Sequence, residues 1–278
     1  IMEFDKNGIL NRAKAAQQSA VAMDEGLRAY MLKVYNYMAT GILLTGIVAL
    51  LTFKMSVVTN DAGSIVGLTS VGNAKKVVIT AGPTIEPIDP VRFLSNRSSG
   101  KMGYALADAA VEAGAHVQVI TGPTHCVKNP RVHYQAVETA AQMLNATMAS
   151  ISDADIFIAS AAVADYAPLN IAAQKIKKQH AQLFIECEKT QDILKQVKHD
   201  YPDCFCVGFA AETDNLIDHA QNKLKQKSLD MVVANQVGIS GQGFDSDYNA
   251  AEIIWPQGRE SISKVRKSEL ARKIIRSI

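Results

Sequence analysis

The amino-acid sequence predicts an α/β protein: a doubly wound, mostly parallel, Rossmann-like sheet with a projecting flap hairpin, preceded by a helical N-terminal segment. Three observations support this fold class. Short β-branched runs alternate with amphipathic runs from residue 76 onward, this rhythm breaks once between residues 165 and 190, and a long uncharged run lies near the N-terminus. Strands that alternate with helices are typical of parallel sheets covered by helices on both faces.

The composition describes a globular protein and excludes some functional classes. The chain has 278 residues, of which 48% are hydrophobic and 20% charged, so it can build an ample core. Its net charge of +2 is too small to indicate nucleic acid as the main partner. The four cysteines form no C-x-x-C pair and the six histidines show no zinc-site spacing. We therefore expect free thiols and no protein-bound zinc.

The N-terminal part differs in character from the rest. We expect a helical segment over residues 1–59 and a linker rich in Gly, Ser and Thr over residues 60–74. Residues 34–53 carry no charge and match the length of one membrane-spanning helix, with a buried helix as the alternative. A signal peptide fits poorly because the apolar run starts late. Ile1 precedes Met2, which suggests a start at Met2 or a longer reading frame.

After the helical segment and the linker, we expect one α/β domain over residues 75–278, because strand-like and helix-like runs alternate there. The tail predicts a second hairpin at residues 251–255 and 261–265, followed by a final helix. The break in the rhythm predicts the flap, with a short alternating run at residues 183–188. Strands are predicted at residues 77–80, 117–121, 155–160, 204–209 and 231–234, and helices at residues 101–113, 139–150, 192–199 and 215–227. In such sheets ligands bind beyond the carboxyl ends of the strands.

The loop after the first predicted strand, TAGPTIEPIDPVRFLSNRSSGKMG at residues 80–103, is long for a compact domain and is therefore expected to be functional. Three prolines stiffen it, while Gly82 and Gly100 allow the backbone to approach a ligand. Ser98 and Ser99 are N-cap candidates for the following helix, whose free N–H groups suit an anion. Neither a Walker A loop nor a dinucleotide fingerprint is present. We expect a phosphate or substrate loop, the alternative being an ordinary capped helix.

Three further motifs follow this loop in the chain. They are AAVADY at residues 161–166, KIKK at residues 175–178 and VGFAAET at residues 207–213. Together, the four motifs resemble phosphopantothenate–cysteine ligase, the synthetase half of a bacterial bifunctional coenzyme A biosynthesis protein. The resemblance covers residues 75–278 and depends on long matches in the family's order and spacing.

The resemblance implies a two-step reaction. The carboxylate of 4′-phosphopantothenate attacks the α-phosphorus of CTP and releases pyrophosphate, and cysteine then displaces CMP from the acyl-cytidylate. It also implies Mg²⁺ bound with the triphosphate, a homodimer with sites near the interface, and a cytoplasmic ligase domain. The flavin-dependent half that usually precedes this ligase has no counterpart in the sequence, so we expect neither flavin nor decarboxylase activity.

The resemblance also assigns roles to individual residues. Asn96 matches the catalytic asparagine and Lys175 the essential flap lysine. The nucleotide-binding positions are Ala159, Ser160, Ala161, Asp165, Lys175, Gln191, Asp192, Ile193, Leu194, Phe209, Lys223 and Lys227, and the phosphate or substrate loop contains Gly82, Ser98, Ser99 and Gly100. No residue is assigned as a protein ligand to a metal.

Each of these roles has a structural alternative. Asn96 could fix a turn through its own backbone, and the lysine clusters could be solvated surface. Lys223 and Lys227 are spaced i,i+4 and share one helical face, whichever role they have. The family's Asn-Pro-Asp-Ile element reads Thr190-Gln191-Asp192-Ile193 in this chain. Backbone contacts are expected to survive that change, whereas side-chain contacts at positions 190 and 191 are not assured.

Residues 23–53 resemble the beginning of the bacterial Bax-inhibitor family, whose other membrane helices are absent from the sequence. If residues 34–53 span a bilayer, Arg28 and Lys33 favour a cytoplasmic N-terminus. The ligase domain would then lie outside, away from CTP. We therefore expect residues 1–75 to be dispensable for the reaction.

Two other functions fit parts of the pattern. One is a catalytically idle nucleotide-binding module tethered to a membrane, which would form no acyl-cytidylate. The other is an NAD(P)-binding reductase, suggested by the β/α rhythm but opposed by the missing G-x-G-x-x-G.

Overall fold

The computed structural model of the chain describes residues 6–59, 65–68, 74–178, 182–212, 214–236, 243 and 246–278. Thr213, the last residue of the VGFAAET motif, and much of the predicted linker lie outside these ranges. The chain divides into two compact units, residues 1–73 and 74–278.

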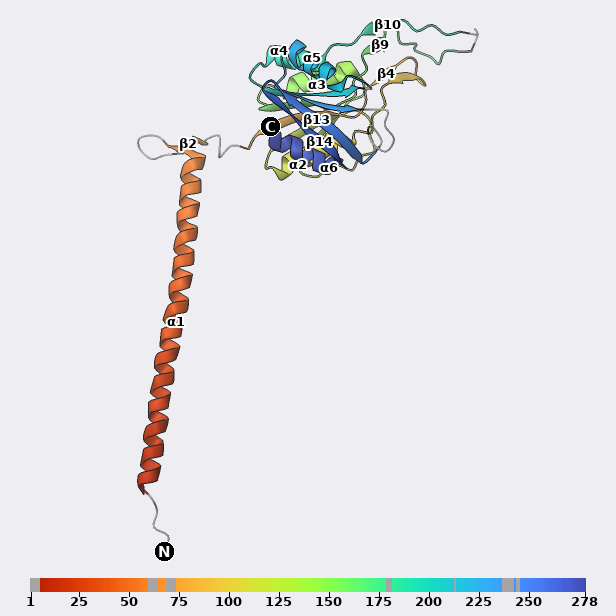
Figure 1. Ribbon diagram of the computed structural model, residues 1–278. Coiled ribbons are helices and arrows are strands. Elements are labelled where there is room, and N and C mark those ends of the chain that lie inside the picture. Colours follow the sequence, from red (N-terminus) through yellow and green to blue (C-terminus); the bar gives the residue numbers. More distant parts are fainter. Residues whose placement is uncertain are drawn as a thin grey trace. The chain divides into compact units, whose positions relative to one another are not determined.

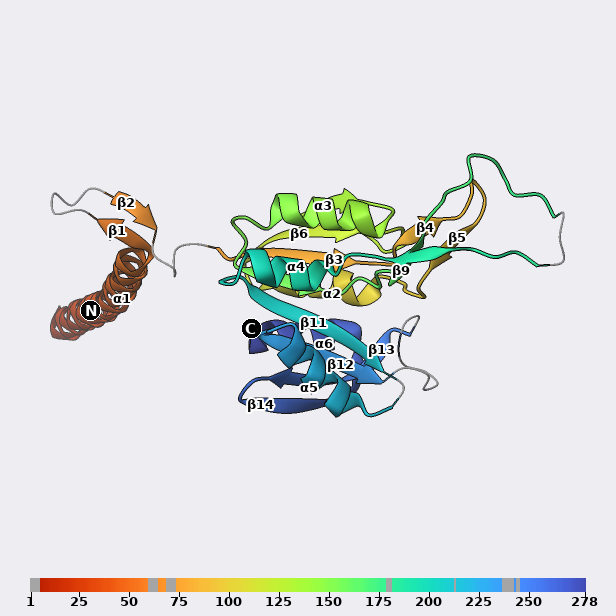
Figure 2. The same ribbon diagram turned by 90° about the horizontal axis from the view of Figure 1, so that it is seen from above.

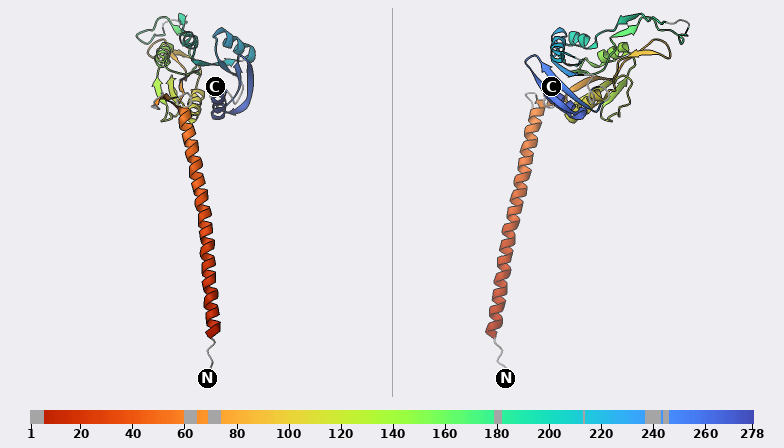
Figure 3. Two further views of the ribbon diagram at one scale, coloured as in Figure 1. Left: turned by 90° about the vertical axis from the view of Figure 1, so that its left-hand side faces the viewer. Right: turned by 45° about the vertical axis from the view of Figure 1, so that its right-hand side comes forward.

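The first unit contains one long helix and a short hairpin. Helix α1 (Lys6–Ser56) is continuous (Figure 3), and strands β1 (Val57–Thr59) and β2 (Ile65–Leu68) pair antiparallel, so the predicted linker contains a strand. Residues Gly26–Met55 have a mean hydropathy of 1.8 and are long and apolar enough to cross a membrane. Leu, Ile, Phe and Tyr side chains are exposed along this stretch. The candidate span is longer than the predicted 34–53, and helix α1 lies within the helical segment expected over residues 1–59.

The second unit is built on one large sheet packed between helices (Figure 1). The sheet has eight strands in the order β14-β13-β12-β11-β8-β3-β6-β7. Strands β12 through β7 in this order run parallel, while β13 and β14 continue the sheet antiparallel. The strands are β3 (Lys76–Ala81), β6 (His116–Thr121), β7 (His133–Ala136), β8 (Ile156–Ala159), β11 (Phe205–Glu212), β12 (Met231–Gln236), β13 (Tyr248–Trp255) and β14 (Gly258–Arg266).

Helices cover both faces of this sheet, which confirms the doubly wound fold. On one face α2 (Lys101–Glu112) and α6 (Lys267–Ser277) share a core with β3 through fully buried Ile79 and Leu106. On the other face Phe157 of β8 packs in a second core with the remaining helices. These are α3 (Ala140–Ser150), α4 (Ile193–Asp200) and α5 (Leu216–Gln226). Continuous apolar strands buried on both faces are typical of parallel sheets.

Two hairpins project together beyond the carboxyl ends of the parallel strands (Figure 2). One pairs β4 (Ile85–Pro87) with β5 (Phe93–Ser95), and the other, the predicted flap, pairs β9 (Tyr166–Pro168) with β10 (Cys187–Lys189). The predicted strand at residues 183–188 is wrong except at its end. Neither β4–β5 nor β7 was expected, because they are short, and prolines or polar residues hide their periodicity.

Removing residues 1–73 is expected to leave the second unit folded, because both of its cores are built from residues 74–278. Circular dichroism should show less helix per molecule and a single cooperative thermal transition at the same midpoint as in the full chain. A truncated chain that unfolds without cooperativity would show that the division into units is wrong.

Candidate functional site

The site is organised around the point where the chain reverses its direction of travel across the sheet. Strand β3 pairs with β6 on one side and β8 on the other, and a crevice between outgoing connections is where such sheets bind ligands. The loops that leave β3 and β8 are joined by backbone hydrogen bonds. Ala162 N donates to Gly82 O over 2.9 Å, and Thr84 N donates to Ala162 O over 3.3 Å.

Side-chain bonds extend this junction. The Thr84 hydroxyl accepts from Ala164 N at 2.9 Å, and Asn96 Nδ2 donates to Val163 O at 2.9 Å. Asn96 is therefore fixed against the loop with the AAVADY motif by one of its two N–H groups, which leaves a second donor on the same nitrogen. The structural alternative, in which the Asn96 side chain bonds to the backbone of its own turn, does not describe the contact of Nδ2.

Glycines make the close packing of these loops feasible. Gly82 and Gly100 have φ values of 74° and 76°, which L side chains rarely adopt. A Cβ on Gly103 would lie 2.6 Å from Ala81 Cβ, so helix α2 could not approach β3 as it does. Two of these glycines belong to the predicted substrate loop.

A cleft of about 890 Å³ opens at this junction, within the range of small-molecule sites. It is lined by loops and strand ends from separate parts of the chain. Among the predicted residues, those that line it are Asn96, Ala159, Ala161, Asp165, Gln191, Asp192, Ile193, Leu194, Phe209, Lys223 and Lys227. Asn96 and Asp165 are exposed there, as ligand-contacting polar groups need to be.

The Thr190-Gln191-Asp192-Ile193 segment keeps its place in the cleft through Thr190. The Thr190 hydroxyl donates to Ala164 O at 2.7 Å, and Thr190 N donates to Asp165 O at 3.0 Å. Asp192 Oδ1 accepts from Lys195 N at 3.0 Å and so caps α4. The change from the family's Asn-Pro-Asp-Ile sequence to Thr190-Gln191-Asp192-Ile193 is therefore compatible with a backbone that is fixed by hydrogen bonds at Thr190.

Charged side chains gather on the α5 side of the cleft. Lys227 Nζ lies 2.5 Å from Asp192 Oδ2. Burial raises the pKa of Asp192, but hydrogen bonds from Lys227 and from Lys195 N outweigh it, so the net pKa is below the ordinary value. Burial lowers the pKa of Lys223, and the nearby Lys227 ammonium lowers it further. Lys223 Nζ donates to Phe209 O, so this lysine is not the solvated side chain of the structural alternative.

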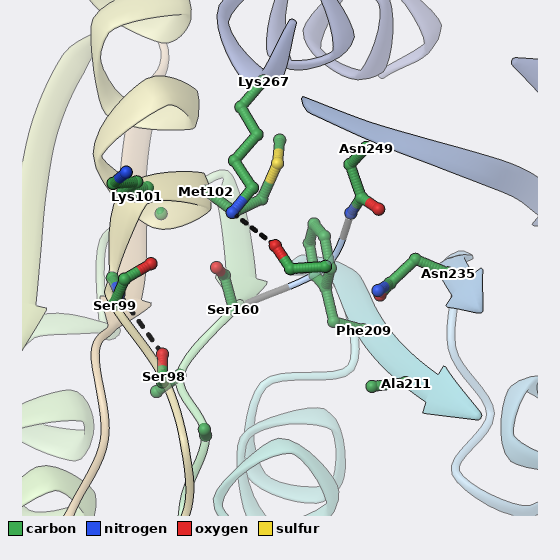
Figure 4. A pocket seen from close by; sticks show the side chains of 15 residues that line it. Ser98, Ser99, Lys101, Met102, Ser160, Phe209, Ala211, Asn235, Asn249 and Lys267 are labelled. Carbon is green, nitrogen blue, oxygen red and sulfur yellow. Dashed lines mark hydrogen bonds between the residues drawn. The ribbon is translucent and has the colours of Figure 1, made fainter. Parts of the chain in front are cut away.

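A second, smaller cavity of about 140 Å³ adjoins the cleft at the N-terminus of α2 (Figure 4). Ser160 and the predicted loop residues Ser98, Ser99 and Gly100 line it, and it shares Ala161 and Phe209 with the cleft. The N-cap prediction is wrong: Gly100 is the N-cap of α2 and no side chain caps the helix. Ser98 Oγ accepts instead from Gly100 N at 3.3 Å. The serines lie beside the helix start because the left-handed turn at Gly100 precedes it.

Sequence reasoning missed the C-terminal wall of this cavity. Lys267, only 6% exposed, points toward it in Figure 4, with Asn235 and Asn249 alongside. Lys267 Nζ donates to Gly243 O at 2.8 Å. The available signal was its position on the apolar face of the last helix, with Leu270 and Ile274 at i+3 and i+7. None of the described residues lining the cavity is acidic, so its charge balance favours an anion.

The predicted flap lysine lies apart from both cavities. Lys175 is exposed and lines neither of them.

Within the described part of the chain, no three His, Cys, Asp or Glu side chains gather as a metal would require. All four cysteines are free, and Cys204 and Cys206 are buried.

The fold and the cleft define a doubly wound α/β domain with a small-molecule site at its topological switch point. The sequence matches the model of the DNA/pantothenate metabolism flavoprotein C-terminal domain over residues 73–278. The chain belongs to that family. This match confirms the predicted resemblance; because it begins at residue 73, the resemblance of residues 23–53 to the Bax-inhibitor family stays a prediction.

Curated relatives are coenzyme A biosynthesis bifunctional proteins CoaBC. The protein from Vibrio vulnificus YJ016 is 46% identical over 209 residues, covering 73% of this chain and 52% of the relative. The one from Escherichia coli K12 is 44% identical over 208 residues, covering 73% and 51%. The chain thus spans about half the length of the curated relatives it matches.

Solved structures agree with the fold. The crystal structure of the C-terminal domain of a CoaBC protein has a TM-score of 0.62 at 39% identity, covering 73% of this chain and 93% of that one. The DNA/pantothenate metabolism flavoprotein from Streptococcus pneumoniae has a TM-score of 0.63 at 24% identity, with coverages of 73% and 98%, and supports the fold alone.

Proposed function

We propose that residues 74–278 are a phosphopantothenate–cysteine ligase domain that works through an acyl-cytidylate. The observation that carries this proposal is the cleft, which brings together residues from separate motifs in a domain of the CoaBC family. Joining two anions requires neutralised charge and alignment more than a nucleophilic side chain. The cleft supplies Lys223 and Lys227 on one wall and a fixed amide, Asn96, on another.

CTP is proposed to lie along the cleft. The backbone of Ala159 and Ala161 and the Asp165 carboxylate would read the edge of cytosine, whose amino group is a donor. Lys223 and Lys227 would face the phosphates. Mg²⁺ would arrive with the triphosphate, since this ion usually keeps several waters and binds substrate phosphates.

The smaller cavity is proposed to receive an anionic group of a substrate. N–H groups at the uncapped start of α2 and the buried Lys267 ammonium both favour negative charge. Ser98, Ser99 and Ser160 add hydroxyl donors. At about 140 Å³, the cavity suits one such group and not a nucleoside.

Asn96 is proposed to act in the second step. As cysteine attacks the acyl carbonyl, its oxygen becomes negative, and a fixed amide N–H aimed at that oxygen stabilises the charge. The bond from Nδ2 to Val163 O fixes the amide in advance.

The decisive assay incubates the full chain with 4′-phosphopantothenate and CTP, with and without cysteine, and repeats it with ATP. Pyrophosphate release without cysteine, and phosphopantothenoylcysteine with it, are the expected results. An idle module would bind CTP and release nothing. A reductase would bind NAD(P), an outcome that the family match already disfavours.

Asn96→Ala is expected to leave pyrophosphate release nearly unchanged and to slow amide formation by about 10²–10³-fold, the usual cost of one oxyanion donor. Acyl-cytidylate should therefore accumulate, which quenched-flow chromatography would detect. Equal losses in both steps would contradict the assignment of Asn96 to the second step.

Lys223→Met is expected to weaken CTP binding by roughly ten- to hundredfold, because a charge-assisted hydrogen bond contributes about 1.5–3 kcal/mol. Titration calorimetry measures this directly. Lys225→Met is the matched control, since Lys225 is on the same helix but exposed and outside the cleft. If both variants bind CTP equally, the α5 wall does not contact phosphates.

A second copy of the chain is the proposed partner of the two projecting hairpins. Large apolar side chains are exposed along them: Val91, Phe93, Tyr166, Leu169, Ile171, Leu183 and Phe184. Exposed apolar patches of this kind mark interfaces. Phe93 lies three residues before Asn96, so such a dimer would put the cleft close to the interface.

Phe93→Glu is expected to convert a dimer of residues 74–278 into monomers, because a charge would be buried in an apolar contact. Light scattering would measure the mass. Val127→Glu, at a residue that is 92% exposed and belongs to neither hairpin, should leave the mass unchanged. A wild-type monomer at micromolar concentration would overturn the proposed dimer.

The N-terminal unit is proposed to have no part in the reaction. The described residues that line the cleft belong to the second unit. The apolar stretch Gly26–Met55 is the proposed membrane contact of the full chain.

A further inference from the structure

A buried carboxylate lies at the turn between β4 and β5, outside both cavities. Asp89 is 2% exposed. Its Oδ1 accepts from the backbone N–H groups of Val91 and Arg92, both at 2.8 Å, which close the turn. Its Oδ2 accepts from Arg92 Nη2 at 2.6 Å and Nε at 3.0 Å, a two-pronged ion pair.

This ion pair also holds the flap. Ile176 N donates to Asp89 Oδ2 at 3.2 Å, and Arg92 Nη2 donates to Ile176 O at 2.7 Å. Both polar backbone groups of Ile176 are therefore bound by one Asp–Arg pair. A third bond, from Ala172 N to Ile88 O at 3.0 Å, ties the same stretch of the flap to the same turn.

Lys175 lies between these two attachment points, immediately before Ile176. Its backbone is thus tied to the β4–β5 hairpin, whose second strand leads directly into Asn96. The side chain of Lys175 remains exposed and able to reorient, while the position from which it starts is fixed. The two residues assigned to catalysis therefore stand on one continuous hydrogen-bonded frame.

The protonation state of Asp89 suits this role. Burial raises its pKa, but N–H groups of Val91, Ile176 and Arg92 and the Arg92 guanidinium outweigh burial and hold the pKa well below its usual range. The carboxylate thus stays charged throughout the pH range in which an enzyme of this kind is assayed, and the attachment stays closed.

We propose that Asp89 and Arg92 are positioning residues for Lys175 in the first step of the reaction. The proposal rests on the proposed function and on the role that the family resemblance implies for Lys175, the flap lysine, to which we assign neutralisation of charge as the carboxylate of 4′-phosphopantothenate meets CTP. Neither Asp89 nor Arg92 lines the cleft, so they act through the flap backbone and not by touching substrate. A small misplacement of a positioned group can cost about 10²-fold in rate.

The test is a double-mutant cycle on the full chain, read as pyrophosphate release with CTP and 4′-phosphopantothenate but no cysteine. Asp89→Asn keeps the shape of the side chain and removes its charge, and is expected to slow release by about ten- to hundredfold. Lys175→Gln is expected to nearly abolish it. Adding Asp89→Asn to Lys175→Gln should cause no further loss, because the ion pair acts through that lysine.

Two matched variants complete the cycle. Arg92→Lys keeps the charge but cannot bond Asp89 and Ile176 O together as a planar guanidinium does, so it should resemble Asp89→Asn. Asp153→Asn removes an exposed carboxylate paired with Lys76, away from the hairpins, and should change nothing. Full first-step activity in Asp89→Asn, or a loss that adds fully to that of Lys175→Gln, would overturn the proposal.

A readout without turnover separates this proposal from the proposed function. Trypsin cuts after Lys175, Lys177 and Lys178, and the attachment at Ile176 should slow these cuts in the wild-type chain relative to Asp89→Asn, with the thermal midpoint measured alongside. If the chain released no pyrophosphate yet showed this protection, the ligase function would fail and the anchoring would stand. Equal cleavage of both proteins would overturn the anchoring itself.

Discussion

The backbone junction between the loops after β3 and β8 is the constraint on which the site depends. Ala162 N donates to Gly82 O, where the chain takes a φ of 74° that suits glycine, and Gly103 separately lets α2 lie against β3. Once these loops are joined, Asn96, Asp165 and the start of α2 have fixed relative positions. The position of the cleft therefore follows from the topology of the sheet and from the backbone hydrogen bonds between these loops. The side chains then determine its chemistry.

The lysine ammonium groups of the site have hydrogen-bond or ion-pair partners within the protein itself. Lys223 donates to a carbonyl oxygen, Lys227 pairs with Asp192, and Lys267 donates to Gly243 O. Such partners hold buried or half-buried ammonium groups in place before any anion arrives, since a buried polar group without a hydrogen-bond partner would be costly. In the proposed reaction, a phosphate that enters would replace some of these partners with charge-assisted bonds to its own oxygens.

Much of the fold and cleft could be read from the sequence because local and distant signals agree. The β-branched runs became the parallel strands within three residues of their predicted ends, and long motifs located the loops and strand ends that carry Asn96, Asp165 and Phe209. The N-cap of α2 was mispredicted because serine is a preferred N-cap residue, and Ser98 and Ser99 stand just before the helix. The structure instead has Gly100 as the N-cap, in a left-handed conformation and so close to Thr124 that a Cβ would lie 2.6 Å from Thr124 Cγ2. Lys267 was missed because its partner, Gly243, is 24 residues away in the chain. The Asp89–Arg92 pair was missed because its partner, Ile176, lies on the other hairpin, and no hydrophobic periodicity in the sequence predicts that these hairpins meet. The proline-rich turn at β4–β5 has no alternation to detect.

The small cavity draws its walls from the first strand-to-helix turn of the domain and from its last helix, since Gly100 and Lys267 face the same space. A nascent chain emerging from the ribosome presents the loops after β3 and β8 well before α6 follows. The small cavity is therefore complete only once the whole domain has been synthesised. Chains that end before α6 would expose the N-terminus of α2 without the opposing wall that carries Lys267.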